Sequence, residues 1–229
     1  MIAAVAVCPH PPLLFRELTG TQDVAADLRA ACVAAITVAT DPAPDRVVVV
    51  GGADHSGAWD PTLPPEVATF GTTGGRPAAP GLPLSLGVAR RLLQESGWQG
   101  AVELHAIAWD AADPEVDALA GAVAEGEGRT VLVVLGDGSG RRGDKAPGYI
   151  DERAFPFDDA TGRALSEGDV ESVLGMDAVL SAELMVSCRA PFAVMATAVR
   201  REGAAPRARM LYRDDPFGVM YFVATWELV

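Results

Sequence analysis

The sequence predicts an α/β protein whose central, mostly parallel sheet is flanked by helices. Residues 46–50 and 130–135 are continuous runs of mainly β-branched and aliphatic residues, as in strands buried on both faces. Segments with helical spacing of apolar residues separate such runs, and this alternation is typical of βαβ units. We therefore expect the first strands along the chain to pair in parallel.

The expected elements follow in order from the same patterns. We expect strands at residues 1–7, 46–50, 101–108 and 130–135, alternating with helices at 23–40, 84–96 and 115–124. We expect further helices at 156–165, 169–174, 177–186 and 191–200, then two closing strands at 207–212 and 218–226. No repeat or linker interrupts the pattern, so we expect a single domain over residues 1–229.

Size and charge limit the classes of partner. A chain of 229 residues can bury a core without stapling. Its formal net charge of −13 argues against nucleic acid and anionic membrane surfaces as partners, because both would repel it. No apolar run approaches the length of a membrane span. Small molecules and proteins remain as partners.

Cysteine usage and the first residues favour the cytoplasm. Cys8, Cys32 and Cys188 are widely spaced, which gives no disulfide framework and fits a reducing compartment. Residues 1–7 are apolar but lack a basic segment before them and run directly into prolines. We expect these residues to form a first strand, not a signal peptide.

Two of the three histidines directly follow predicted strands. His10 follows the first strand and His55 follows the second. Carboxyl ends of parallel strands meet at one edge of a sheet, so these imidazoles predict a metal site there. The alternative is that each is a hydrogen-bonded residue of the sheet edge. His105 lies within the strand at 101–108, and we expect it to be structural.

Two long loops are expected at the same edge. Residues 60–83, dense in proline, glycine and threonine, predict a lid or binding loop. Residues 136–148 are rich in glycine and would either bind an anion through backbone amides, helped by neighbouring basic side chains, or form a solvated flexible loop. Asp144 stands where a Walker A loop requires lysine.

These motifs resemble the class III extradiol ring-cleavage dioxygenases, the family related to the β (catalytic) subunit of protocatechuate 4,5-dioxygenase and, more distantly, to Memo-like proteins. The resemblance rests on His10 before Pro11-Pro12, on Asp54-His55 followed by Trp59-Asp60, and on the frame at 135–141. It covers nearly the whole chain, though the loops and closing strands match only in outline.

The resemblance implies a subunit-B-like fold and a ferrous ion bound by His10 and His55, with a small catechol-type aromatic compound as substrate. Such a site needs two imidazoles and one carboxylate, which leave positions for the catechol oxygens and dioxygen. Another divalent metal, or no metal, is the alternative. We expect Trp59 and Arg141 to contact the substrate. Relatives pair through sheet edges or join a second subunit, so a homo-oligomer is expected.

Two positions depart from the family pattern. Gly140 stands where the family has its acid/base histidine. The absence of such a group lowers the rate of the catalysed reaction roughly 10²–10⁴-fold. The glutamate ligand should fall near Val186, where the closest carboxylate is Glu183. Asp137 and Ser139 are the candidate catalytic substitutes.

The departures leave three functions open. The first is a metal-dependent oxidoreductase with impaired or altered extradiol chemistry. The second is a non-catalytic relative that keeps the fold as a small-molecule or protein binding module. The third is a metal-free hydrolase or transferase that uses Asp137 and Ser139, for which the sequence offers no partner base.

Overall fold

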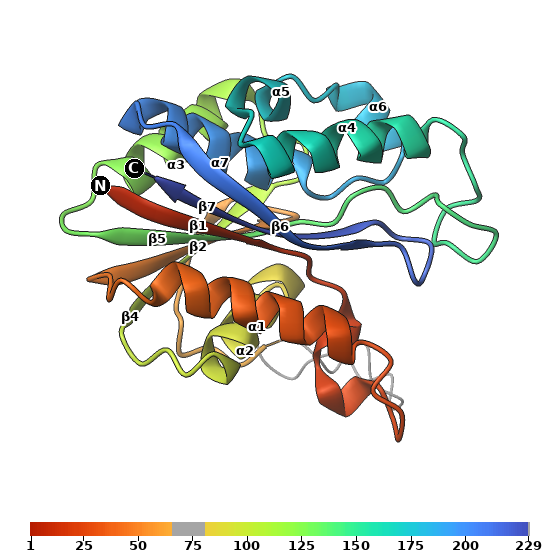
Figure 1. Ribbon diagram of the computed structural model, residues 1–229, viewed down its shortest axis with the longest axis horizontal. Helices are drawn as coiled ribbons and strands as arrows, with labels where there is room; N and C mark the ends of the chain where they lie inside the picture. Colours follow the sequence, from red (N-terminus) through yellow and green to blue (C-terminus); the bar gives the residue numbers. More distant parts are fainter. Residues whose placement is uncertain (66–80, 229) are drawn as a thin grey trace.

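The computed structural model describes residues 1–65 and 81–228, and these form one sheet in the order β3-β4-β2-β5-β1-β7-β6 (Figure 1). The strands are β1 (Ile2–Cys8), β2 (Arg46–Ala53), β3 (Gly57–Trp59), β4 (Ala101–Ala108), β5 (Thr130–Leu135), β6 (Pro206–Asp214) and β7 (Tyr221–Leu228). The helices are α1 (Ala26–Thr40), α2 (Leu84–Glu95), α3 (Asp113–Ala124), α4 (Ala154–Glu167), α5 (Val170–Leu174), α6 (Ala178–Glu183) and α7 (Arg189–Glu202).

The four central strands β4, β2, β5 and β1 are parallel, which confirms the predicted α/β class. In the outer strands the direction changes. β7 runs antiparallel to β1, β6 runs antiparallel to β7, and β3 runs antiparallel to β4. β2 and β5 are fully paired inside the sheet, so their β-branched runs are buried on both faces, as the pattern predicts.

The short strand β3 was not predicted. Its three residues are exposed or half-buried and show no apolar alternation. The strand forms because the chain turns back after β2 and pairs with the free edge of β4, where Ala58 lies opposite His105. Such a strand forms only by pairing with the edge of a neighbouring strand, since its own sequence has no strand pattern.

Helices cover both faces of the sheet (Figure 1). α1 and α2 pack on one face, and α3, α4, α5 and α7 pack on the other. α1 turns a stripe of apolar residues toward the sheet, namely Leu28, Cys32, Ala35, Ile36 and Ala39. α7 is buried along most of its length, and Pro191 lies in its first turn, where no backbone donor is needed.

The connections leave the sheet in opposite directions at its carboxyl edge. After β1 and β2 the chain passes to the face of α1 and α2, whereas after β4 and β5 it passes to the face of α3 and α4. Neighbouring strands therefore send their connections apart, which opens a crevice at their carboxyl ends.

Two further expectations concern the loop at 60–83 and membrane-spanning segments. Most of the predicted lid at 60–83 lies outside the described residues, because 66–80 are not described. None of the helices within 1–65 and 81–228 has the length and apolarity needed to cross a bilayer.

Candidate functional site

A cavity of about 340 Å³ lies at the carboxyl ends of the strands, and we call it the rim cavity. This volume falls in the range of small-molecule sites. The loops after β1, β2 and β4, strand β3 and the start of α2 all contribute to it. Its lining is His10, Gly52, Ala53, Asp54, His55, Trp59, Gly81, Pro83, Leu84, Ser85 and Trp109. The cavity brings together His10 and His55, which follow the predicted strands, and Trp59.

His10 is held on two sides. Its ring stacks on Trp109, with centroids 5.9 Å apart and an interplanar angle of 14°. Its backbone N–H donates to Oδ1 of Asp137 over 2.8 Å, and its Nδ1 lies 3.6 Å from the same oxygen. His10 is only 6% exposed, and its Nδ1 has no hydrogen-bond partner among residues 1–65 and 81–228. The imidazole is therefore fixed between an aromatic ring and a carboxylate.

Asp137 is fixed in turn by the segment before α7. Its N–H donates to Oγ of Ser187 over 3.0 Å, and its carbonyl accepts from the N–H groups of Ser187 and Cys188 at 3.1 and 3.0 Å. Burial raises the pKa of the Cys188 thiol well above its ordinary value, and the carboxylates of Asp158 and Asp137 add to this. Cys188 is therefore a packed thiol that anchors Asp137 through its backbone.

The Gly51-Gly52 pair makes room for the cavity wall. A Cβ on Gly52 would lie 1.7 Å from Cζ3 of Trp109, so only glycine lets that ring lie against the end of β2. A Cβ on Gly51 would lie 2.5 Å from Oγ of Ser85. That hydroxyl donates to the Gly52 carbonyl over 2.7 Å. Paired glycines at a strand end indicate that side chains lie close to the backbone there, although the sequence does not show which side chains these are.

Asp54 and His55 form the outer wall of the rim cavity, and both are exposed. The turn that carries them is tied to the end of β4, where the Ala108 N–H donates to Oγ of Ser56 over 2.8 Å. Asp54 thus lines the same cavity as the two imidazoles.

The donors fit part of a ferrous site. A carboxylate beside Nδ1 of His10 is the arrangement that orients imidazole ligands of metals. Within residues 1–65 and 81–228, however, no three His, Cys, Asp or Glu side chains are grouped closely enough to hold a metal ion. Glu183, the nearest carboxylate in sequence to the expected ligand position, bonds Arg153 at 2.7 Å and lies outside the lining of the rim cavity. The described residues therefore supply two imidazoles and leave the ligand set incomplete.

Ser139 belongs to a buried network instead of the rim cavity. Its hydroxyl and its N–H donate to the two oxygens of Asp158, at 2.5 and 2.9 Å. Nη1 of Arg142 lies 3.3 Å from the same carboxylate, which is completely buried. Burial raises the pKa of Asp158, although the Ser139 and Arg142 hydrogen bonds act in the opposite direction. This network accounts for the buried hydroxyl without a catalytic role.

Of the two alternatives for residues 136–148, anion binding by backbone amides has no support in the first half of the loop. The amides of Gly136, Gly138 and Gly140 already donate to backbone carbonyls of β1, the β6–β7 turn and the end of α6. Arg142 is bound by Asp158 and Asp215. Arg141 does not line the rim cavity, so its predicted contact with substrate has no geometric support there.

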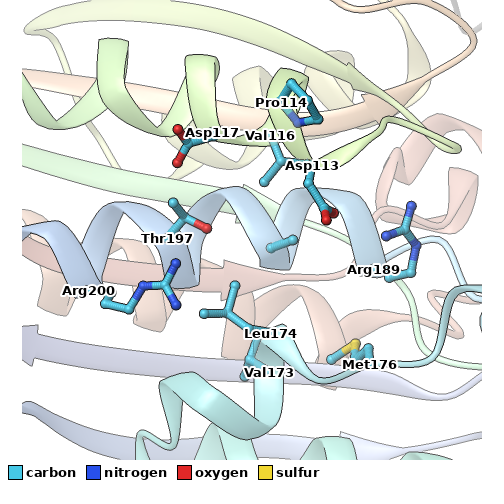
Figure 2. Close-up of a pocket in the computed structure, with 11 residues that line it drawn as sticks. Asp113, Pro114, Val116, Asp117, Val173, Leu174, Met176, Arg189, Thr197 and Arg200 are labelled. Carbon is cyan, nitrogen blue, oxygen red and sulfur yellow. The ribbon is translucent and has the colours of Figure 1, made fainter.

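A separate cavity of about 570 Å³ lies between α3, α5 and α7 (Figure 2). Figure 2 shows Arg189 and Arg200 at its two ends, with Asp113 and Asp117 on α3. Its charges are balanced, and Asp117 already binds Arg201 at 2.7 Å. None of the predicted site residues lines it, so the rim cavity remains the candidate site.

Comparisons with known proteins give the fold and no family. No protein-family model matches the chain, and no curated protein matches it. Among solved structures, the chain is similar to the crystal structure of uncharacterized protein JW3007 from Escherichia coli K12, with a TM-score of 0.55 and 14% sequence identity. The similarity covers 98% of this chain and 99% of that chain. At this identity the likeness shows a shared α/β fold.

Proposed function

We propose that this protein binds a small, planar aromatic compound in the rim cavity. The observation that carries the proposal is the buried His10 imidazole, which stacks on Trp109 and lies beside Asp137. It lines the cavity at the strand ends where neighbouring connections leave to opposite faces of the sheet. Trp59 adds a second indole to the lining. Aromatic rings around a few convergent polar groups favour a flat aromatic ligand with polar substituents.

We infer further that the ligand is catechol-type and the chemistry a metal-dependent, extradiol-like oxidation. His10 and His55 would hold the ferrous ion, with another divalent metal as the alternative. When bound, such an ion supplies adjacent positions for two phenolic oxygens and dioxygen. Of the protein groups, Asp137 would orient the His10 ring, while Trp59 and Trp109 would bracket the aromatic ring and exclude water from it.

A second candidate function, ligand binding without turnover, is favoured by two specific observations. Gly140 occupies the position of the family's acid/base histidine. The substitute Ser139 is committed to Asp158 inside the protein. A chain without that base would keep the pocket and lose most of the rate.

The test is an anaerobic titration of metal-stripped protein with ferrous iron, in which calorimetry measures the binding. The wild type is compared with His10→Ala/His55→Ala and with His105→Ala, the matched control, because His105 lies mid-strand outside the lining. We expect one equivalent bound by the wild type and the control and none by the double variant. Equal binding by all three proteins, or none, would refute the metal site.

Catechol is then added with and without iron, and heat and oxygen uptake are recorded. Oxygen uptake that needs iron and both histidines supports the oxidation. Catechol binding without oxygen uptake, weakened by Trp109→Ala, supports the binding function. No catechol binding under either condition refutes both.

A further inference from the structure

A third cavity, of about 710 Å³, lies at the amino-terminal end of β1, on the face covered by α1. We call it the basic cavity. Its lining is Met1, Ala3, Ala4, Val38, Ala39, Asp41, Pro42, Arg129, Arg207, Ala208, Arg209, Thr225, Trp226, Glu227 and Leu228. Figure 1 places the start of β1 at the opposite end of the sheet from the loops after β1 and β5. β1 itself spans about 20 Å, so this cavity is separate from the rim cavity.

The strand register determines which side chains face the basic cavity. Ala6, Thr225 and Arg209 lie opposite one another on β1, β7 and β6. Directly opposite residues point to the same face of a sheet, and Ala6 packs in the cluster that contains α1. Thr225 and Arg209 therefore project toward α1. The small alanines of β1 leave space between the helix and the sheet.

The charge of the basic cavity opposes that of the protein. The chain has 31 acidic and 18 basic residues, yet three arginines line this cavity: Arg129, Arg207 and Arg209. Arg207 has a carboxylate within reach, Glu227 at 3.5 Å. Within residues 1–65 and 81–228, Arg129 and Arg209 form no ion pair. Planar guanidinium groups of this kind bind carboxylates with two hydrogen bonds.

The hydroxyl of Thr225 adds a polar anchor beside Arg209. Thr225 is 8% exposed, and its hydroxyl forms no hydrogen bond with another described residue. By contrast, the hydroxyls of Thr40 and Thr161 donate to nearby helix carbonyls. A hydroxyl on a cavity wall without a protein partner can still donate a hydrogen bond to a ligand. It lies on the strand position directly opposite Arg209.

The remaining lining is apolar. Val38 is 56% exposed, although it is a large hydrophobic side chain, and it lines the cavity together with Ala39, Pro42 and Leu228. One part of the cavity thus carries arginines and a hydroxyl, and the part next to it is apolar. This arrangement matches a ligand that carries one acidic group on a hydrocarbon body.

We propose that the basic cavity binds an amphipathic monocarboxylate. Arg209 and Thr225 bind its carboxylate, Arg129 adds attraction at longer range, and its hydrocarbon body lies against Val38 and Ala39. Asp41 is the lining carboxylate without an ion pair among the described residues. It lies at the end of α1, so the acidic group of the ligand is directed away from it and toward β6.

Isothermal titration with hexanoate and with hexanamide tests this proposal. The two probes share a hydrocarbon chain and differ in charge. We expect hexanoate to bind the wild type and hexanamide to bind about tenfold more weakly or not at all, since one charge-assisted bond is worth roughly that factor. Arg209→Ala and Thr225→Val should each weaken hexanoate, the first by about tenfold.

Arg163→Ala is the matched control, because it removes the same charge from α4 on the other face of the sheet. It should bind hexanoate as the wild type does. Circular dichroism confirms folding of each variant, and shifts of the Thr225 amide and Arg209 Nε–H signals in ¹H–¹⁵N spectra locate the ligand. Equal binding of both probes, no binding of hexanoate, or equal losses in Arg163→Ala and Arg209→Ala would overturn the proposal.

Discussion

The backbone N–H of His10 donates a 2.8 Å hydrogen bond to Oδ1 of Asp137, a residue 127 positions later in the chain. This bond joins the carboxyl ends of the neighbouring strands β1 and β5. Because the His10 ring also stacks on Trp109, the inner wall of the rim cavity depends on contacts from three strand ends.

Asp137→Ala should destabilise the protein. The variant leaves the partly buried His10 amide without its acceptor, which costs about 1–3 kcal/mol in the free energy of unfolding. Urea denaturation followed by circular dichroism measures the change. Asp110→Ala is the control, since that carboxylate is exposed, and it should stay within about 0.5 kcal/mol of the wild type. Equal free energies for the two variants would contradict the role of Asp137.

Gly52→Ala should displace the Trp109 ring. The added Cβ would lie 1.7 Å from Cζ3 of that ring, so we expect a loss of about 1–3 kcal/mol in the free energy of unfolding. Removing the ring restores the space. The double variant Gly52→Ala/Trp109→Ala should therefore lose less than the sum of the single losses, as measured in a double-mutant cycle. Strict additivity would show that the ring does not occupy that space.

Asp158→Ala should be among the costly single changes. It leaves the Ser139 hydroxyl and amide without acceptors and removes one of the two carboxylates that pair with the mostly buried guanidinium of Arg142. Breaking a buried ion pair from one side costs about 3–5 kcal/mol. Thermal and urea unfolding measure the loss. Asp159→Ala, the exposed neighbour on α4, should cost far less, and similar losses for both would count against the network.

The pH dependence of stability should reveal the same carboxyl group. Burial raises the pKa of Asp158 above its ordinary value of 3.8, so the folded state holds this proton more tightly than the unfolded state does. Its contribution to stability is present below 3.8 and is lost as pH rises through the folded pKa.

Comparison with Asp158→Asn isolates that contribution. The free energy of unfolding of the wild type minus that of the variant should fall as pH rises from 3.8 through the folded pKa and then level off. Urea unfolding at a series of pH values gives this difference. A difference that rises with pH would mean that the Arg142 ion pair outweighs burial.

Local patterns predicted the central sheet well. β4 and β5 have the predicted bounds. The apolar run of β5 is buried between β1 and β2, whereas β4 lies nearer the edge of the sheet and is partly exposed. Helix ends moved by a few residues, and α7 begins before Pro191. β3 was missed because an exposed three-residue strand forms only against an existing edge.

The meeting of the two histidines at one cavity follows from the same strand patterns. His10 and His55 follow strands, so parallel pairing alone brings them to one cavity. Ser139 also follows a strand, but its hydroxyl is bound by Asp158, which α4 brings back to the β5 loop. No spacing in the sequence marks that pairing, and the predicted catalytic role of Ser139 could not be weighed against it.

The sequence by itself determined the order of helices and strands along the chain, apart from β3, and the sheet edge at which the histidines meet, since both follow from local apolar periodicity and parallel pairing. Only the tertiary structure decided which side chains face the cavity and which are bound elsewhere. The contacts between His10 and Asp137 and between Trp109 and Gly52 join residues from different strand ends. Such contacts depend on how whole elements pack, and that packing is set by the sum of many distant interactions.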